Sequence, residues 1–360
     1  MPRRSVRHMA LGALGTLIVL ALGGFLIAWS GLYNVAASRG HWAIVEWMLA
    51  FGMRNSVELR AFMIDAPDLD DAGMILLGAN HYRTGCAPCH GAPGINADPV
   101  AQAMLPPPPD LTGVAERWRD NELFWIVKHG IKYTGMPAWV AQSRDDEVWS
   151  LVAFLKALRA MSADRYADLL RSPDERSSDV MREAGALCGG CHGGPGGGPR
   201  SALLPGLHGQ KRDYLMASLA AYADGTRFSG IMQPVAGNLS QAQIRSFAHF
   251  YSALPQRPVG SAAPDAGLAN GRRLAETGAP AAGIPACDSC HGGDALSIYP
   301  LLSGQGAAYL AAQLQLWKKG LRNATGPSAI MAPFAERMTD KEIDDVSAFY
   351  AAQPPMQASR

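Results

Sequence analysis

The sequence carries little charge and no large excess of either sign. Charged residues make up 18% of its 360 residues, and 32 lysines and arginines nearly balance 31 aspartates and glutamates, for a net charge of +1. A protein that binds nucleic acid needs a basic surface to neutralise phosphates, so this balance excludes nucleic acid as a general partner. With 48% hydrophobic residues, the chain is also too apolar to be mostly disordered.

The sequence also lacks cysteines outside one repeated motif. All six cysteines lie in three copies of Cys-x-x-Cys-His, which leaves none for a disulfide. The copies recur about a hundred residues apart, whereas a structural zinc site needs two such pairs close enough to supply four ligands. The strand-helix-strand pattern around a thioredoxin-like redox motif is missing as well. The three copies are Cys86-Ala-Pro-Cys89-His90, Cys188-Gly-Gly-Cys191-His192 and Cys287-Asp-Ser-Cys290-His291.

The remaining interpretation of this pattern is covalent attachment of c-type haem. Two thiols separated by two residues add to the two vinyl groups of one porphyrin, and the adjacent histidine becomes an axial ligand of the iron. We therefore expect three covalently bound haem c groups. The predicted attachment residues are Cys86, Cys89, Cys188, Cys191, Cys287 and Cys290, and the predicted proximal iron ligands are His90, His192 and His291.

A methionine is the expected second axial ligand of each iron, because methionine opposite histidine raises the reduction potential. Met136, Met232 and Met331 follow the three histidines by 46, 40 and 40 residues. Each has a proline within two residues, and proline disfavours helix for the residue before it. We therefore expect a loop around all three. Met104 and Met338 are the alternative methionines.

Histidine is the rival ligand type. His129 ends a predicted helix over residues 121–128, where a histidine is a good C-terminal cap. His208 lies in a glycine-rich turn. These positions favour structural roles for both side chains.

The N-terminal region is long enough and apolar enough to cross a membrane. An uncharged stretch of 21 residues runs from Met9 to Trp29, and about 20 apolar residues span a bilayer as a helix. Arginines on its N-terminal side predict a cytoplasmic N-terminus. A signal peptide cleaved near Val35-Ala36-Ala37 is the alternative. We expect a retained anchor over residues 1–40, with the rest of the chain outside the cytoplasm.

Residues 41–71 form an amphipathic segment next to this anchor. Its large apolar side chains have broadly helical spacing with sparse charge, at Trp42, Val45, Met48, Leu49 and Phe51. Three arrangements remain open: the segment lies in the membrane interface, packs on a haem lobe or contacts a partner.

From residue 72 the sequence divides into three lobes, over 72–161, 175–254 and 265–353. A proline-rich linker over 255–264 separates the last two. Lobes two and three are internal repeats, because they share a Gly-Gln pair, a Tyr-Leu pair, a leucine, a glycine and an arginine in the same register. These positions are Gly209-Gln210, Tyr214-Leu215, Leu219, Gly225 and Arg227, and then Gly304-Gln305, Tyr309-Leu310, Leu314, Gly320 and Arg322.

All three lobes resemble class I cytochrome c domains, in which an N-terminal helix, Cys-x-x-Cys-His, a methionine loop and a closing helix follow one another. The first resembles the single-haem type, and the last two resemble the tandem dihaem family of the c-four type. The resemblance implies an all-α fold, low-spin haems and single-electron transfer. The first lobe's matching positions are Gly78, Tyr82, Pro109-Asp110-Leu111 and Gly135-Met136-Pro137-Ala138-Trp139.

Three haems would also add six propionates to an exported body that holds 28 basic and 31 acidic residues once the four arginines of residues 1–40 are set aside. From the repeat register, Arg227 and Arg322 are candidate partners for buried propionates.

Together these features predict an electron carrier rather than an enzyme. It would be a single-pass protein of the bacterial inner membrane with three haem domains in the periplasm. The expected donor is a quinol–cytochrome c reductase or a dehydrogenase, and the expected acceptor is an oxidase or a soluble cytochrome. A respiratory shuttle and a dedicated subunit of a periplasmic dehydrogenase both fit. A multihaem peroxidase would need an iron with an open sixth site, which a methionine for every iron disfavours.

Overall fold

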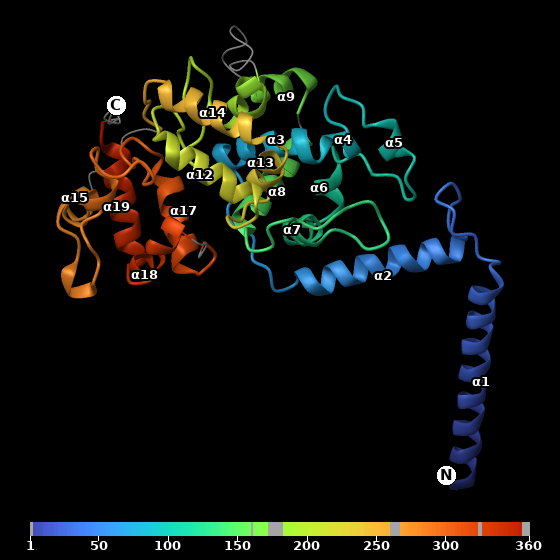
Figure 1. The fold of residues 1–360 in the computed structure, drawn as a ribbon. Helices are drawn as coiled ribbons and strands as arrows, with labels where there is room; N and C mark the ends of the chain where they lie inside the picture. The colour runs from blue at the N-terminus through green and yellow to red at the C-terminus, as the bar shows by residue number, and fades with distance from the viewer. Residues whose placement is uncertain (1–2, 160, 172–182, 260–266, 323–325, 355–360) are drawn as a thin grey trace.

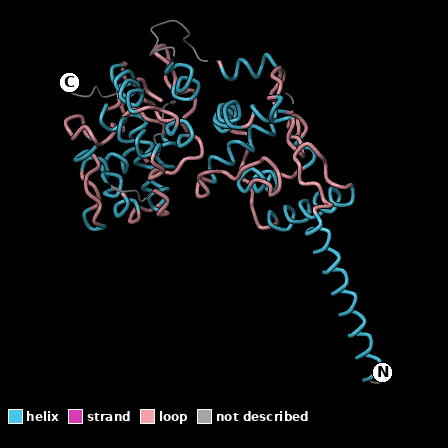
Figure 2. Tube along the Cα trace, turned by 45° about the vertical axis from the view of Figure 1, so that its right-hand side comes forward, coloured by secondary structure: helices cyan, strands magenta, loops and turns pink. Residues whose placement is uncertain are grey.

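The computed structural model describes residues 3–159, 161–171, 183–259, 267–322 and 326–354, with side chains described from residue 8 onward except at residues 326 and 327. Within these ranges the chain is helical and has no β-strand, only two isolated bridges (Figure 2). This confirms the expected all-α class. The expected starts of lobes two and three, at residues 175 and 265, and the end of the predicted linker, at 260–264, lie outside the described residues.

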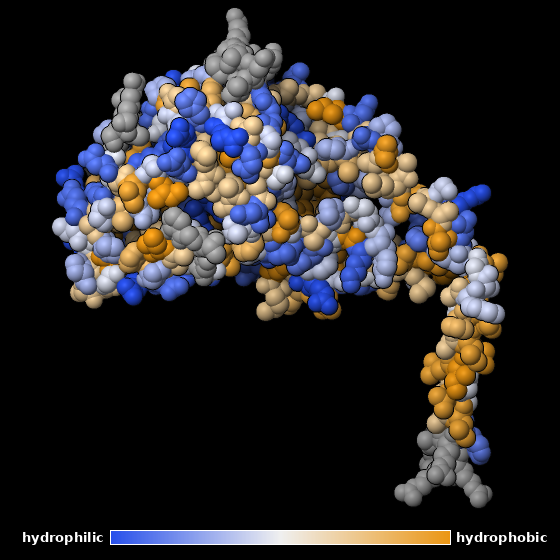
Figure 3. Space-filling view, viewed as in Figure 1, coloured by the Kyte–Doolittle hydropathy of each residue, from blue (hydrophilic) through white to orange (hydrophobic). Residues whose placement is uncertain are grey.

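Two helices precede the lobes: α1 (Arg3–Ser30) and α2 (Ala43–Ala61). α1 stands away from the rest of the protein, with apolar side chains along its length (Figure 3). Its segment His8–Ser30 is apolar and long enough to cross a membrane, and the protein buries none of it. A signal sequence has the same properties. α2 runs in a different direction, toward the underside of the lobe that follows (Figure 1).

The first lobe is built around two long helices that cross closely. Its helices are α3 (Ala72–Gly85), α4 (Ala87–His90), α5 (Pro99–Gln102), α6 (Val114–Arg117), α7 (Asp120–His129), α8 (Asp145–Leu158) and α9 (Ala163–Leu170). The helices expected over 121–128 and 145–160 are both present, as α7 and α8. The closing helix α8 ends at Leu158, two residues before its expected end, and residue 160 is outside the described residues.

The second and third lobes share one order of elements: the motif turn, a middle helix, a short helix at the methionine and a closing helix. In the second these are η1 (Gly185–Gly189), α11 (Gly190–His192), α12 (Arg212–Ala223), α13 (Met232–Gly237) and α14 (Gln241–Ala253). In the third they are α15 (Leu268–Glu276), η2 (Pro280–Ala282), α16 (Asp288–His291), α17 (Ala307–Lys318), η3 (Gly326–Ile330), α18 (Ala332–Ala335) and α19 (Asp340–Ala352).

A glycine allows the first and last helices of a lobe to touch. A Cβ placed on Gly78 of α3 would lie 2.1 Å from the carbonyl oxygen of Ser150 in α8. In the third lobe, a Cβ on Gly271 of α15 would lie 2.2 Å from the carbonyl oxygen of Asp345 in α19. Any larger residue at either position would push the two helices apart.

The C-terminal half of α2 packs on the first lobe. Val57 and Ala61 are fully buried, and the side-chain amide of Asn121 in α7 donates a hydrogen bond to the Ala61 carbonyl oxygen at 2.9 Å. The N-terminal half instead leaves Trp47 and Phe51 about 60% exposed, with their rings stacked on one another. Packing on a haem lobe, one of the three open alternatives, therefore applies to one half of this helix.

Candidate functional site

Each Cys-x-x-Cys-His motif forms a helical turn that ends at its histidine. The three turns are α4, the end of η1 with α11, and α16. Because residues three apart lie on one face of a helical turn, the two thiols of each motif project to the same side, as attachment to one ring requires. All six thiols are partly buried and free.

The pKa values of three of these thiols are raised, unlike those of redox-active cysteines. Burial raises the pKa of Cys86 and of Cys188 to about 12, and that of Cys287 to about 11. Reactive thiols need a lowered pKa, because the thiolate is the nucleophile. The polypeptide environment therefore gives no sign of a dithiol redox centre.

The three motif histidines share one hydrogen bond that fixes the tautomer of the ring. In each, Nδ1–H donates to the backbone carbonyl oxygen of a proline, because a carbonyl can only accept. Nε2 is then the nitrogen left to bind a metal, as in other sites where a second partner orients a ligating histidine. The pairs are His90 with Pro109 at 2.8 Å, His192 with Pro205 at 3.0 Å and His291 with Pro300 at 2.9 Å.

The acceptor prolines leave a short sequence signal. A leucine stands two residues after each of them, in Pro109-Asp110-Leu111, Pro205-Gly206-Leu207 and Pro300-Leu301-Leu302. Only the first of these triplets belongs to the family resemblance. The interval from histidine to proline falls from 19 to 13 to 9 residues, so the shared position is hard to see without the structure.

One continuous cavity of about 650 Å³ joins the sites of the second and third lobes. Its walls include His192 and Met232, and also His291 and Met331. The structure thus brings each predicted histidine and methionine of these two lobes to one cavity. His90 and Met136 lie outside it. The pairing of each histidine with its methionine across an iron stays a prediction.

The backbone around two of the three methionines differs from the expected loop. Met136 does lie in a loop, but Met232 is the first residue of α13, and Met331 lies in a turn at the N-cap of α18. The following prolines are compatible with this, because the first turn of a helix has no intrahelical acceptor for its N–H groups. Proline therefore marks the start of a helix here and not its absence.

The alternative ligands occupy distinct places. Met338 is 6% exposed, belongs to the apolar core of the third lobe and also lines the cavity. The Met104 sulfur lies against Gly135, next to Met136. His129 is the last residue of α7, as predicted. His208 is 2% exposed and stacks on Tyr251, and both of its ring nitrogens lack a hydrogen-bond partner.

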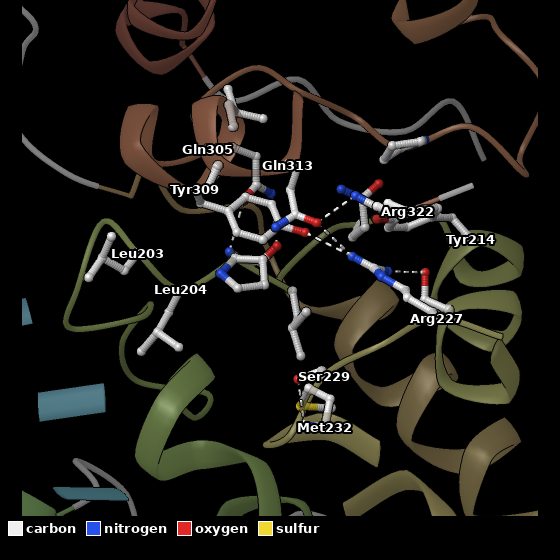
Figure 4. A pocket seen from close by; sticks show the side chains of 18 of the residues that line it. Leu203, Leu204, Tyr214, Arg227, Ser229, Met232, Gln305, Tyr309, Gln313 and Arg322 are labelled. Atoms are coloured by element: carbon white, nitrogen blue, oxygen red, sulfur yellow. Dashed lines mark hydrogen bonds between the residues drawn. The ribbon is translucent and has the colours of Figure 1, made fainter. Parts of the chain in front are cut away.

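Two arginines at the boundary of lobes two and three are buried without a carboxylate partner among the described residues. Arg227 and Arg322 are each 8% exposed, and both donate to the same side-chain oxygen of Gln313, at 3.2 Å and 2.5 Å (Figure 4). Among the described residues, Arg322 Nε has no hydrogen-bond partner. Buried cations without an anion are costly.

This arginine pair tests whether the cavity fits a haem. Burial alone would raise the pKa of Tyr214, yet the guanidinium groups of Arg227 and Arg322 outweigh it and lower that pKa to about 7. The cluster therefore has an excess of positive charge beside an apolar cavity. Haem propionates are carboxylates on an apolar ring, and the residues present fit such a group.

Two glutamines connect lobes two and three through reciprocal hydrogen bonds. Gln210 donates to the carbonyl oxygen of Leu301 at 3.0 Å and accepts from its N–H at 2.8 Å. Gln305 makes the same pair of bonds to Gly206, at 2.8 Å and 2.9 Å. Each bonded residue directly follows a proline that holds a motif histidine. The Gly-Gln repeat signature is thus an interlobe clamp that supports the histidine of the opposite lobe.

Replacing Gln305 with alanine is expected to lower the free energy of unfolding by about 2 kcal/mol or more, because it leaves both polar groups of Gly206 buried and unpaired. Chemical denaturation of the haem-loaded protein, followed by far-ultraviolet circular dichroism, measures the loss. Gln241→Ala, at an exposed position, is the control and should change stability by less than ~0.5 kcal/mol. Equal effects of the two substitutions would contradict the clamp.

His81 of the first lobe also lines the cavity, and its ring packs on Trp139 with 4.6 Å between centroids. Burial lowers the pKa of His81 from 6.5 to about 4. The unfolded chain therefore binds a proton at higher pH than the folded chain. Stability contributed by the neutral ring is complete above pH 6.5 and is lost as the pH falls toward 4.

We expect His81→Gln to reduce this acid sensitivity by up to about 3 kcal/mol between pH 7 and pH 4. Denaturation curves of both proteins at several pH values give the slope. The exposed His249, changed to glutamine, controls for the loss of a histidine. A wild-type slope in His81→Gln would rule out His81 as the source.

The helical fold, the three motif turns and the apolar cavity beside two buried arginines define a haem-binding electron-transfer protein. Two family models match the chain: cytochrome c oxidase, cbb3-type, subunit III over residues 74–155, and cytochrome c over residues 268–351.

Known relatives agree with this class. The thiosulfate dehydrogenase electron acceptor of Thiomonas intermedia is 42% identical over 175 residues, which is 47% of this chain and 79% of that protein. Cytochrome c4 of Pseudomonas aeruginosa is 33% identical over 168 residues, 46% of this chain and 82% of that protein. A solved cytochrome c4 structure from Acidithiobacillus ferrooxidans covers 47% of this chain and 99% of its own, at 31% identity and a TM-score of 0.43.

The chain belongs to the class I c-type cytochrome family. Members of this family carry covalently bound haem c and transfer electrons, which confirms the expected cofactor class and the general function.

Proposed function

We propose that this protein is a membrane-anchored periplasmic cytochrome with three haems, which carries single electrons from a periplasmic dehydrogenase to a terminal acceptor. The repeated geometry of the motif histidines supports three sites: each ends a helical turn with its Nδ1–H on a proline carbonyl. When bound, each haem supplies an iron that alternates between the ferric and ferrous states.

The chain's own residues hold and tune these sites. The six cysteines would attach the rings, and Nε2 of each motif histidine together with one methionine sulfur would bind each iron. The proposed pairs are His90 with Met136, His192 with Met232 and His291 with Met331. Since both ligands stay bound in both oxidation states, the reorganisation on electron transfer is small. We assign these lobes to residues 72–161, 175–254 and 265–353.

Arg227 and Arg322 adjust the potentials of the second and third sites. Their guanidinium groups meet at Gln313, between the two lobes. In this proposal they pair with propionates, and their remaining positive charge favours the ferrous state, which carries one positive charge fewer than the ferric state. A low dielectric around both groups strengthens this effect.

The donor is proposed from chemistry named for two relatives. Thiosulfate dehydrogenase electron acceptors of Thiomonas intermedia and Stutzerimonas stutzeri are 42% and 34% identical to this chain over their matched regions. We propose that a dehydrogenase of this kind passes electrons to the present chain. The first lobe's match to an oxidase subunit family favours a second role, as a carrier that delivers electrons to a haem–copper oxidase.

The N-terminal region supports attachment to the membrane. The segment His8–Ser30 of α1 is apolar, and the protein buries none of it. Trp47 and Phe51 are exposed, and they belong to the N-terminal half of α2, the half nearer to α1 (Figure 1). Tryptophan and phenylalanine on an amphipathic helix are typical of the membrane interface. We propose that this half of α2 lies there and keeps the first lobe close to the bilayer.

Mass spectrometry of the purified protein tests the haem count, and thiosulfate tests the donor. Wild type should carry three haem masses, and replacing both cysteines of one motif by alanine should remove one of them. Adding thiosulfate and the dehydrogenase should reduce the haems within the enzyme's turnover time. Two haem masses in wild type would disprove the three-haem proposal, and no reduction would disprove the donor.

A further inference from the structure

A buried glutamate of the first lobe bonds to the methionine segment of the second. Glu147 of α8 is 3% exposed. One of its carboxylate oxygens accepts a hydrogen bond from the Ser229 hydroxyl at 2.6 Å, and the other accepts from the backbone N–H of Gly230 at 2.5 Å. These contacts join residues 82 and 83 positions apart in the sequence.

Ser229 relays this contact to Met232. Its hydroxyl oxygen, whose hydrogen is used by Glu147, accepts from the backbone N–H of Met232 at 3.0 Å and from that of Ile231 at 3.3 Å. Ser229 and Met232 lie side by side at the wall of the cavity (Figure 4). The carboxylate therefore fixes the first turn of α13, from which the methionine side chain projects.

Arg144 completes the connection. It forms a salt bridge with Glu147 at 2.9 Å and donates a hydrogen bond to the Phe228 carbonyl oxygen at 3.0 Å. A buried carboxylate is stable only when it is paired and hydrogen-bonded. Among the described residues, the Glu147 carboxylate is paired with Arg144 and with the segment just before Met232.

The methionine segments of the first and second lobes also touch each other. Trp139 lies three residues after Met136, and a Cβ placed on Gly230 would be 2.0 Å from its indole nitrogen. Only glycine leaves room for this ring. Ile231 packs against the apolar core of the first lobe. The residues just before Met232 are therefore built into the first lobe.

First-lobe side chains also form part of the second lobe's cavity wall. Asn80 and His81 of α3 and Trp149 of α8 line the same cavity as Cys188, Cys191 and His192. In this chain the covering surface is another lobe.

We infer that Glu147 is a positioning residue for Met232, and that the first lobe is an integral part of the second haem site. This rests on the proposed role of Met232 as an axial ligand. The iron–methionine bond of the second haem would then depend on the first lobe. That lobe resembles a different subtype and directly follows α1 and α2.

Imidazole competition in the full haem-loaded protein tests this inference. Imidazole displaces a weakly held methionine, and the methionine–iron absorbance at the red end of the visible spectrum reports the displacement. In Glu147→Ala we expect imidazole to bind the second haem about 10-fold more tightly, equal to about 1.4 kcal/mol. Ser229→Ala, which removes the relay but keeps the carboxylate, should give a similar gain.

The matched control is Glu122→Ala. Glu122 is also a buried glutamate of the first lobe, 7% exposed, but it bonds to Arg119 at the start of α7. It should leave imidazole binding within twofold of wild type. A double-mutant cycle between Glu147→Ala and Ser229→Ala should be non-additive, because both remove one connection.

Three outcomes overturn the inference: no change in either Glu147→Ala or Ser229→Ala, an equal change in Glu122→Ala, or additive effects in the cycle. If Glu147→Ala does not load haem, Ser229→Ala decides on its own. A failure of the axial assignment is recognised separately, because Met232→Ala would then keep the full red absorbance. The inference alone fails when Met232→Ala loses absorbance and the two relay variants behave as wild type.

Discussion

Replacing Met232 with alanine is expected to remove about one third of the methionine–iron absorbance and to lower the potential of one haem. A thioether sulfur stabilises ferrous iron, which is why methionine opposite histidine raises the potential. The choice of axial ligands changes haem potentials over a range of roughly 0.8 V, so the reduction potential of this haem should fall by more than about 0.1 V. Spectra during a redox titration measure both quantities. Met136→Ala and Met331→Ala should each affect one other haem.

Met338 gives the sharpest control for this experiment. It lines the same cavity as Met331 and lies only seven residues later, in the core of the third lobe. Met338→Leu keeps the volume and removes the sulfur, so it should leave the absorbance intact. If Met338→Leu removes one third of the absorbance and Met331→Ala does not, the third ligand is assigned incorrectly.

Replacing Arg322 with leucine is expected to lower the potentials of the second and third haems together. A positive charge near an iron favours its reduced state, and a charge in a partly buried site changes this by roughly 1–2 kcal/mol. For a one-electron couple this is about 50–100 mV. Arg227→Leu should act in the same direction, because both guanidinium groups contact Gln313.

The same redox titration, run on two further variants, separates charge from shape. Arg322→Lys keeps the charge but loses the planar fork, so its potentials should fall less than those of Arg322→Leu. Arg212→Leu removes an arginine of α12 whose side chain is 59% exposed, and it should have little effect because water screens exposed charges. If all three variants give the same potentials, the arginine pair does not face the propionates.

Some expectations from the sequence failed where a local rule met its exception. Prolines after Met232 and Met331 predicted loops, yet α13 and α18 begin there. The rule is correct for a helix interior but weak in the first turn, where no hydrogen bond is lost. For α13 the local signal is Ser229, whose hydroxyl oxygen accepts from the Met232 N–H, but Glu147 of another lobe holds that serine in place.

The helical class, the three motif turns, the repeat of lobes two and three and the apolar N-terminal helix can all be predicted from the amino-acid sequence. All of these depend on residues close together in the chain: a two-residue spacer between cysteines, a continuous apolar run, a shared register. Such short-range patterns dictate local geometry directly.

The way in which these parts support one another is visible in the folded chain alone. In the fold a proline carbonyl accepts a hydrogen bond from each motif histidine, and Gln210 and Gln305 each bond to the backbone of the opposite lobe. Glu147 is buried against the segment before Met232. The two glutamines and the glutamate bond to residues 82 to 99 positions away. A buried polar group must find a partner, but its own sequence neighbourhood does not specify which one, because that depends on how the lobes pack.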